Sequence, residues 1–526
     1  MARFFSTAGP IKREKHYYIE PLERVNLEEI LALIRDEKYF VLHAPRQTGK
    51  TTLLLALMDY LNQEDRYKCV YVNVEPAQAA RGDVKKGMRA ILALLAKSAA
   101  LFSKDTFLKE NWKPIFEDSG EFVALQDALS QWSQASEKPV ILFIDEVDTL
   151  VGDTLISLLR QLRGGYTMRP DMFPQSIILC GVRDVRDYRI HSALEKDIIT
   201  GDSAFNIKSE SLKLGNLTFD EIKKLYEQHS KETGQSFDEN TFPLIWQLTE
   251  GQPWLINALA DEACFKMEEG RNREKDITID TINQAKENLI LRRDTHLDQL
   301  ADKLKEERVR NVIEPILAGS IEAEKITADD VSYTADLGLI QTSPQVRIAN
   351  RIYQEIIPRE LTYSTQITIY QETSWYLLEN GRLDMDKLLT AFQGFFRKNF
   401  ESWVDGFNYR EAGPQLLLQS FLQRIVNSGG RVEREYGLGR QRTDLLVTWP
   451  HKQGCQEIVL ELKLLYGNRE KTIKKGLEQT WEYLDKCGTT EGYLLIFDRN
   501  KKRTWKEKIF KDKRTFKGIT IGIYGM

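Results

Sequence analysis

The chain contains little cysteine and no long apolar run, and each of these absences excludes some classes of protein. Its 5 cysteines are scattered, with no C-x-x-C pair, which argues against a disulfide framework or a zinc site. The longest apolar stretch, residues 91–102, is interrupted by Lys97 and predicts a buried helix. The amino-terminal stretch lacks the apolar segment of a signal peptide. We therefore expect a cytoplasmic protein with no membrane partner.

The overall charge favours no class of partner, because the formal net charge is only -4. Any surface that binds a polyanion must therefore be local. The chain is 42% hydrophobic and 29% charged, which is typical of globular proteins and excludes a mainly disordered chain. It has no internal repeats and no low-complexity segments. A length of 526 residues predicts several domains.

The first 210 residues alternate between short apolar runs and helical patterns, which predicts an α/β fold with an open parallel sheet. Two of the runs, residues 139–150 and 175–184, are continuously apolar, as strands buried on both faces are. The expected strands lie within residues 39–43, 69–74, 139–150 and 175–184.

The sequence pattern changes after residue 210, where amphipathic helices begin. Thr218, with Glu221 three residues later, predicts a capping box at the first of them. Short helices and strands then suggest a winged-helix-like module. The predicted boundaries are 1–210 for the α/β core, 211–295 for a helical lid, 296–365 for the winged-helix-like module, 366–405 for a helical bridge and 406–526 for a last α/β unit.

The loop from Ala44 to Thr51 matches G-x-x-x-x-G-K-[ST] except that Ala44 replaces the first glycine. Gly49 lets backbone N–H groups close around a phosphate, Lys50 reaches the phosphate oxygens, and the Thr51 hydroxyl ligates Mg²⁺. ATP is the expected nucleotide. The residues of this stretch expected to bind it are Gln47, Thr48, Gly49, Lys50, Thr51 and Thr52.

Two acids follow the apolar run that begins at residue 139. Asp145 ends the expected strand and is placed to hold Mg²⁺, while Glu146 is placed to orient an attacking water. The alternative for Glu146 is a solvated carboxylate at the end of a strand.

Together APRQTGKTT, ILFIDEVD and EGQPWLINALA resemble the AAA-like ATPases of the archaeal-ATPase and STAND group, over residues 15–290. The resemblance implies a P-loop ATPase of the ASCE type with a helical lid and a winged-helix module. It implies that Arg183 contacts the γ-phosphate, with Arg186 and Arg189 as alternatives. Gly251 and Pro253 match the G-x-P turn of the lid. Homo-oligomers are common in this group, which leaves self-association open.

A second candidate site lies in the last unit. Residues two apart in a strand face the same side, so Glu461 and Lys463 should project together, with Asp444 on a strand that could pair beside them. Two carboxylates, Asp444 and Glu461, can hold Mg²⁺ or Mn²⁺, and a lysine can orient water for phosphodiester hydrolysis. The alternative is an edge strand on which Glu461 and Lys463 are merely solvated.

The order of these residues resembles the PD-(D/E)xK nuclease superfamily over residues 405–500. The resemblance adds Gln479 and Tyr483 as a Q-x-x-x-Y helix. It also adds Glu411, with Gln415 as a competitor, as the acid of the leading helix. Thr443 stands where the family has proline before its first acid.

The segment from residue 498 to 518 carries ten Lys and Arg residues with Trp505 and Phe510 among them. Such a stripe beside a nuclease site suits binding to a phosphate backbone, and DNA is the expected partner. A solvated basic face is the alternative.

The two sites together predict a nucleotide-controlled, metal-dependent nuclease that acts on DNA, by analogy in defence against foreign DNA. The alternative is a STAND-like nucleotide switch whose nuclease-like domain binds nucleic acid without cutting it. A slowly hydrolysing switch is a further reading of the ATPase.

Overall fold

In the computed structural model the chain divides into two compact units. Unit 1 comprises Met1–Arg292 with Tyr333–Leu339, and unit 2 comprises Arg293–Ser332 with Ile340–Met526. The described residues are 3–192, 197–292, 300, 302–318, 326–361, 376–406, 414, 417–419, 421–422, 430–434, 437–438, 441–442, 445–465, 467–498, 500 and 503–526.

Unit 1 is built on a parallel sheet, as the alternation of strand and helix patterns predicts. Its five strands have the order β2-β3-β4-β1-β7, and each neighbouring pair is parallel. Every residue of β3 and β4 is buried, which explains why these two runs are apolar throughout. The strands are β1 (Tyr39–His43), β2 (Lys68–Asn73), β3 (Val140–Asp145), β4 (Ser176–Gly181) and β7 (Lys208–Lys213).

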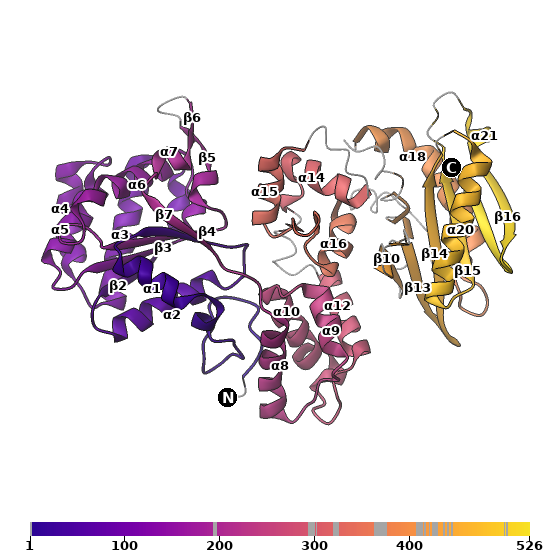
Figure 1. Cartoon of the computed structure of the whole chain (residues 1–526), viewed down its shortest axis with the longest axis horizontal. Helices are drawn as coiled ribbons and strands as arrows, with labels where there is room; N and C mark the ends of the chain where they lie inside the picture. Colours follow the sequence, from indigo (N-terminus) through magenta and orange to yellow (C-terminus); the bar gives the residue numbers. More distant parts are fainter. Residues whose placement is uncertain are drawn as a thin grey trace. The chain divides into compact units, whose positions relative to one another are not determined.

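Helices cover both faces of this sheet (Figure 1). Helices α1 and α2 pack on the face that carries Phe40, Tyr71 and Phe143. Helices α3 to α6 pack on the other face, around Val72 and Trp132. The helices are α1 (Leu27–Arg35), α2 (Lys50–Gln63), α3 (Val84–Phe102), α4 (Phe107–Ser119), α5 (Ala124–Ala135), α6 (Gly152–Gly164) and α7 (Gly201–Ala204), and β5 (Arg189–Ser192) pairs with β6 (Asp197–Thr200).

A helical part follows β7 in unit 1, in the range expected for the lid. The capping box is confirmed: Thr218 Oγ1 accepts from the Glu221 N–H, and the Glu221 carboxylate accepts from the Thr218 N–H. Gly234 ends the same helix in the left-handed conformation. The helices are α8 (Phe219–Thr233), α9 (Thr241–Thr249), α10 (Pro253–Asp261), α11 (Glu268–Arg271) and α12 (Ile279–Arg292).

The next elements follow the order helix, helix, hairpin, helix. Strands β8 and β9 are antiparallel, and the carboxyl end of α15 belongs to unit 1. The assignment as a winged-helix-like module stays a prediction, as do the domain boundaries. The elements are α14 (Glu307–Ala318), α15 (Ala328–Asp336), β8 (Ile340–Gln341), β9 (Arg347–Ile348) and α16 (Arg351–Leu361).

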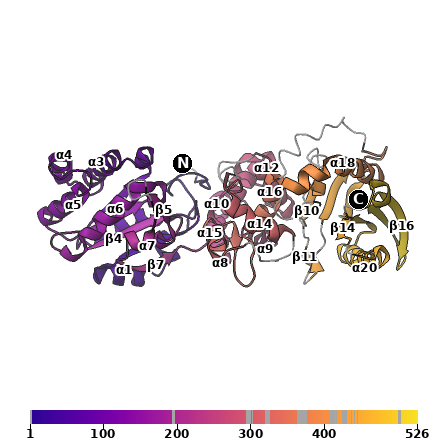
Figure 2. The same cartoon turned by 90° about the horizontal axis from the view of Figure 1, so that it is seen from above.

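Unit 2 contains a mixed six-stranded sheet in the order β10-β13-β14-β15-β17-β16. Helices α18 and α20 cover opposite faces of it (Figure 2). Helix α18 falls largely in the range predicted as a bridge, yet Phe392 and Phe396 on it pack into the core of this sheet. The elements are α18 (Met385–Gly406), β10 (Arg431–Arg434), β11 (Gly437–Leu438), β12 (Gln441–Arg442), β13 (Leu445–His451), β14 (Gly454–Leu464), α20 (Arg469–Cys487), β15 (Glu491–Phe497), α21 (Trp505–Lys508), β16 (Phe510–Phe516) and β17 (Ile519–Gly525).

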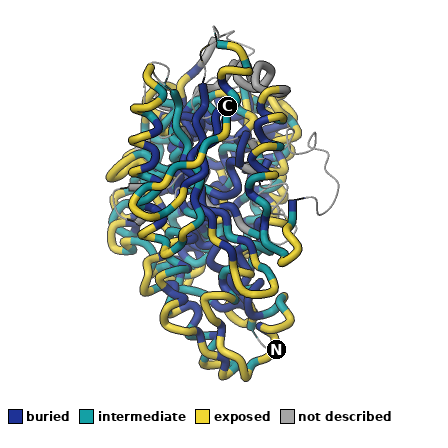
Figure 3. The backbone as a smooth tube through the Cα atoms, turned by 90° about the vertical axis from the view of Figure 1, so that its right-hand side faces the viewer, coloured by how far each residue is buried: buried dark blue, intermediate teal, exposed yellow. Residues whose placement is uncertain are grey.

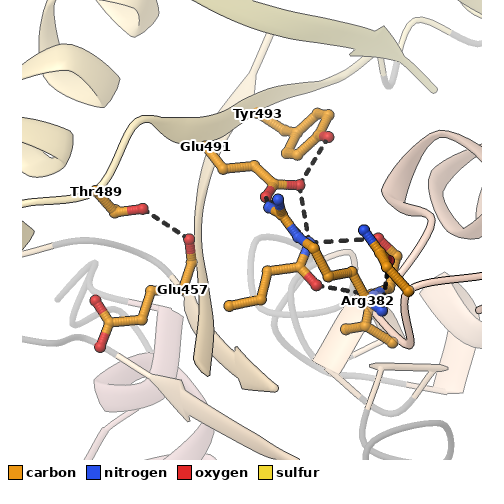
Figure 4. A network of polar contacts seen from close by, with 8 residues as sticks. Arg382, Glu457, Thr489, Glu491 and Tyr493 are labelled. Atoms are coloured by element: carbon orange, nitrogen blue, oxygen red, sulfur yellow. Dashed lines mark hydrogen bonds and ion pairs between the residues drawn. The ribbon is translucent and has the colours of Figure 1, made fainter. Parts of the chain in front are cut away.

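A polar network joins the first residues of β15 to the start of β14 (Figure 4). The Glu491 carboxylate accepts from Arg382 at 2.6 Å, from Gln456 at 3.0 and 3.1 Å and from the Tyr493 hydroxyl at 3.3 Å. Gln456 Oε1 in turn accepts from the Leu383 N–H at 2.8 Å. The network therefore ties the segment before α18 to two strands of the sheet.

Buried residues gather toward the interior of the tube and exposed residues on its outer turns (Figure 3). Within the part of the chain that the structure describes, no helix combines the length and apolar character needed to cross a membrane.

Candidate functional site

The loop between β1 and α2 has a backbone conformation at residue 49 that requires a glycine. Gly49 has φ +100°, and a Cβ at that position would lie 2.8 Å from Arg24 Nη1. Gln47 is exposed with φ +59°. Ala44 is fully buried and its φ is not positive, so this position needs no glycine. The departure from the motif at Ala44 is thus compatible with the loop.

The Lys50 side chain is folded into the loop that precedes it. Its ammonium donates to the carbonyls of Ala44 at 2.8 Å and Pro45 at 3.0 Å. The Thr48 hydroxyl donates to the Pro45 carbonyl at 2.7 Å. These bonds hold the loop closed around the lysine.

Arg24, outside the loop in sequence, is a further cation that contacts it, and the sequence did not predict this contact. Its guanidinium donates to the Thr48 carbonyl at 2.9 Å and to the Gly215 carbonyl at 2.8 Å. Burial lowers the pKa of Arg24. Arg24 therefore links the loop to the segment after β7, and no local motif around it could have signalled that contact.

Asp145 lies at the end of β3 with no exposed surface. Its Oδ2 accepts from the Thr51 hydroxyl at 2.7 Å and from the Tyr71 hydroxyl at 2.9 Å. The structure thus brings together the two residues predicted to hold Mg²⁺, which were far apart in sequence. A carboxylate and a hydroxyl oxygen at the start of a phosphate-binding helix are ligands that Mg²⁺ prefers.

Glu146 follows Asp145 with φ +60°, a left-handed conformation that is unusual for a residue with a Cβ. Its N–H donates to Asp145 Oδ1 at 2.9 Å. Burial, and then the charges of Asp148 and Asp145, raise the pKa of Glu146, while Lys50 and Arg46 oppose the rise. A half-buried carboxylate with a raised pKa suits a group that accepts a proton from water better than a merely solvated carboxylate does.

Thr52 contacts the amino-terminal segment of unit 1. Its hydroxyl accepts from the Ile11 N–H at 3.2 Å. The same segment is held to α10, because the Trp254 indole donates to the Thr7 carbonyl at 2.9 Å. The predicted G-x-P turn opens α10: Gly251 has φ +78°, and Pro253 is the first residue of the helix.

Arg183 follows β4 and is nearly buried. Its Nε donates to Asp336 Oδ2 at 3.1 Å, with only 9% and 12% of the two side chains exposed. Its guanidinium also lies over the Tyr333 ring at 4.9 Å. The side chains of the two alternatives, Arg186 and Arg189, lie outside the described residues.

Tyr333 and Asp336 belong to a short segment of unit 1, Tyr333–Leu339. This segment also reaches the phosphate-binding loop, which is the loop between β1 and α2. Gly338 has φ +78°, and a Cβ there would lie 2.8 Å from Pro45 Cβ. A side chain at residue 338 would therefore collide with the loop.

In unit 2, Glu461 and Lys463 lie on one face of β14 and form an ion pair. Glu461 is 2% exposed, so the pair is not simply a solvated polar face. Helix α20 packs on this face of the sheet and carries Gln479 and the buried Tyr483. Asp444, Glu411 and Gln415 lie outside the described residues. Among the described residues, no three His, Cys, Asp or Glu side chains gather as a ready-made metal site.

Several residues of the basic stripe pair with acids of unit 2. Lys511 and Lys513 both pair with Asp386, at 3.0 and 3.8 Å, and Arg514 pairs with Glu470 at 2.7 Å. These ion pairs reduce the positive charge that the stripe offers to a polyanion. Arg499, Lys501 and Lys502 lie outside the described residues. The described basic residues of the stripe are Arg503, Lys506, Lys508, Lys511, Lys513, Arg514 and Lys517.

Comparison with known proteins gives one family match: the model of the AAA-like domain matches residues 6–356. No curated protein matches the chain. Among solved structures, the Walker-type ATPase of Pyrococcus abyssi is 15% identical with a TM-score of 0.44, covering 67% of this chain and 99% of that one.

Two further solved structures have lower scores. The RuvB Holliday junction branch migration motor of Thermotoga maritima is 14% identical, with a TM-score of 0.33 and coverage of 64% and 94%. Cdc6p of Pyrobaculum aerophilum is 12% identical, with a TM-score of 0.36 and coverage of 75% and 97%.

Proposed function

Because this chain belongs to the AAA-like domain family, we propose that it binds and hydrolyses ATP with Mg²⁺ at the loop around Lys50. The observation that carries the proposal is the buried corner in which Thr51 and Asp145 meet beside the closed loop of Lys50. A phosphate-binding lysine and a paired hydroxyl and carboxylate are the parts that P-loop ATPases use.

Each residue has a distinct role in this proposal. Backbone N–H groups at the start of α2 hold phosphate oxygens, and Lys50 exchanges its carbonyl partners for them. Thr51 and Asp145 hold Mg²⁺, which neutralises charge on the phosphates when it is bound. Glu146 orients the attacking water and accepts its proton.

Replacement of Lys50 tests the nucleotide site. Lys50→Ala should weaken binding of a fluorescent ATP analogue about 10- to 100-fold, the loss of hydrogen bonds to a charged group. Lys97→Ala is the matched control, because Lys97 is exposed on α3 and remote in sequence from the loop. Equal affinity in Lys50→Ala and Lys97→Ala contradicts the proposed site.

We further propose that Arg183 responds to the γ-phosphate and that Asp336 competes for it. The support is the nearly buried pair between Arg183 and Asp336, with Tyr333 against the guanidinium. A γ-phosphate offers Arg183 a stronger partner than one carboxylate. Withdrawal of Arg183 from Asp336 then releases the Tyr333–Leu339 segment, which couples nucleotide state to the rest of the chain.

For unit 2 we propose a metal-dependent nuclease acting on DNA. Its support is the ion pair of Glu461 and Lys463, buried on the sheet face that α20 covers with Gln479 and Tyr483. Asp444 and Glu461 are the proposed ligands of Mg²⁺ or Mn²⁺. Nucleic-acid binding without cleavage is the second candidate. The ion pairs of Lys511 and Arg514 weigh against both candidates, because they reduce the positive charge available to a polyanion. We also propose that the protein acts in defence against foreign DNA and that it assembles into homo-oligomers.

Replacement of Lys463 separates the two candidates for unit 2. Lys463→Ala should abolish Mg²⁺- or Mn²⁺-dependent cleavage of linear or circular DNA while ATP binding is retained. Because the variant leaves the buried Glu461 without its cation, Lys463→Arg is added to preserve the charge, and thermal melting checks that both variants fold. Lys471→Ala, on the exposed face of α20, is the control. If wild type cleaves DNA and Lys463→Ala cleaves it equally well, the nuclease assignment is ruled out. If wild type binds DNA but does not cleave it, the second candidate is favoured.

A further inference from the structure

Two hydroxyl groups converge on one oxygen of Asp145. Thr51 Oγ1 donates to Oδ2 at 2.7 Å, and the Tyr71 hydroxyl donates to the same atom at 2.9 Å. The proposed function gives Thr51 and Asp145 a role but leaves Tyr71 without one. Tyr71 comes from β2, the strand next to β3, and no motif of the sequence includes it.

The register of the sheet brings Tyr71 to this position. Strands β2 and β3 are parallel, with Tyr71 opposite Phe143 and Asn73 opposite Asp145. The side chain of Tyr71 lies on the sheet face that α2 covers. Its ring packs edge-on against Phe102 with centroids 6.1 Å apart, and only 8% of the residue is exposed. The ring is therefore held, and its hydroxyl has a fixed direction.

The hydrogen-bond chemistry at Asp145 explains what Tyr71 contributes. A fully buried carboxylate needs donors for its oxygens. The Glu146 N–H supplies Oδ1, while Thr51 and Tyr71 supply Oδ2. A carboxylate oxygen can only accept, so the Tyr71 hydroxyl is the donor of the 2.9 Å bond.

Thr51 is the other hydroxyl that donates to Asp145 Oδ2. It is the first residue after Lys50 in α2, and it is also the proposed ligand of Mg²⁺. Tyr71 reaches Asp145 from the neighbouring strand β2, whereas Thr51 reaches it from α2. Tyr71 therefore gives Asp145 a hydroxyl donor that does not itself have to bind Mg²⁺.

From this geometry we propose that Tyr71 is a positioning residue that fixes the Asp145 carboxylate for Mg²⁺ at the nucleotide site. The inference rests on the proposed function of that site. Tyr71 hydrogen-bonds to Asp145 and to the Thr51 side chain, which are both proposed ligands of Mg²⁺, so it should affect the metal requirement and not the metal-free affinity for nucleotide.

The test is a Mg²⁺ titration of Tyr71→Phe, which keeps the ring against Phe102 and removes only the hydroxyl. A fluorescent ATP analogue is bound first in EDTA and then at increasing Mg²⁺. The Mg²⁺ concentration that half-maximally tightens binding should rise about tenfold, as expected for one lost hydrogen bond. The affinity in EDTA should stay at the wild-type value.

Tyr39→Phe is the matched control. Tyr39 is also a buried tyrosine of the same sheet, and its hydroxyl donates to the Pro174 carbonyl at 2.9 Å. The control loses an equivalent buried hydrogen bond away from Asp145, so its Mg²⁺ requirement should be that of wild type. Thermal melting of both variants shows whether either loss is merely structural.

The outcomes separate this inference from the proposed function. If wild type shows no Lys50-dependent binding of the analogue, the proposed function fails and the inference fails with it. If wild type binds and Tyr71→Phe has an unchanged Mg²⁺ requirement, only the inference fails. An equal shift in Tyr39→Phe, or a weaker affinity of Tyr71→Phe in EDTA, also overturns it.

Discussion

Single residues in unit 1 are held in states that their types do not usually adopt. Glu146 has a positive φ and a raised pKa, and Lys50 is buried among backbone carbonyls. Such strain and burial persist only where surrounding structure enforces them, and they are common at functional sites. Their clustering within one loop and one strand end supports the proposed nucleotide site independently of the motif.

His229 makes the stability of unit 1 depend on pH. It is fully buried among aromatic rings of the helical part, and its Nε2 lies 3.0 Å from Gln235 Oε1. Burial, and then the charge of Arg273, lower the pKa of His229 below its usual 6.5. The unfolded chain therefore binds a proton before the folded one does. Stability is complete above about pH 6.5 and falls as the pH drops below that value, towards the folded pKa.

The pH effect can be measured by thermal melting between pH 7.5 and 5.5. Wild type should lose more stability over this range than His229→Phe, which cannot be protonated. The replacement keeps a ring in the cluster, and Gln235 Oε1 retains its bond from Arg273 at 2.6 Å. The melting temperature of a Lys97→Ala control should fall as that of wild type does. Parallel pH dependence in wild type and His229→Phe is the result that would contradict this account.

At the scale of elements, α8 is defined by signals within its own sequence. The capping box of Thr218 and Glu221 starts the helix, and Gly234 ends it. These are contacts between neighbours in the chain, so the sequence predicts them directly.

Removal of the N-cap side chain of α8 should lower the stability of the protein by the amount typical of such caps. Thr218→Ala loses the acceptor for the Glu221 N–H, which should lower the free energy of unfolding by about 1 kcal/mol. Thr218→Ser keeps an acceptor hydroxyl and should remain close to wild type. Urea denaturation followed by circular dichroism measures both, and equal stabilities of the two variants would show that the capping bond contributes nothing.

The sheet of unit 2 shows which contacts the sequence pattern of a single helix or strand does not predict. Strand β14 was predicted with Glu461 and Lys463 on one side, and the structure confirms that the two side chains meet. The packing of α18 on the same sheet was not predicted, because its apolar stripe marks a buried face and not the partner that buries it.

For the whole molecule, the main consequence is the proposed coupling through Arg183 and Asp336. Asp336→Asn keeps the size of the side chain and removes the charge that holds Arg183. With less competition for the arginine, affinity for a non-hydrolysable ATP analogue should rise about fivefold, the order of one weakened ion pair. Affinity for ADP, which has no γ-phosphate, should change much less.

Asp302→Asn provides the control for that measurement. Asp302 also pairs with a cation, Lys305, but 72% of its side chain is exposed. Its loss should leave both affinities unchanged. Equal affinities of Asp336→Asn and wild type for the ATP analogue, or an equal gain for ADP, would remove the basis for coupling through this pair.

Sequence alone determined the local features of this protein. The loop from Ala44 to Thr51, the strand that ends at Asp145 and the cap at Thr218 are each written in a few consecutive residues. Backbone propensity, periodicity and hydrogen bonds between near neighbours decide such features, and the structure confirms these elements.

Only the tertiary structure decided which distant residues meet. Tyr71 on Asp145, Arg24 on the phosphate-binding loop and Asp336 on Arg183 join residues 74, 24 and 153 positions apart in the chain. Such contacts follow from strand order, register and helix packing, which the pattern of one strand or helix does not specify. The phosphate-binding loop could therefore be predicted from the sequence, whereas the side chains that hold its partners in place could not.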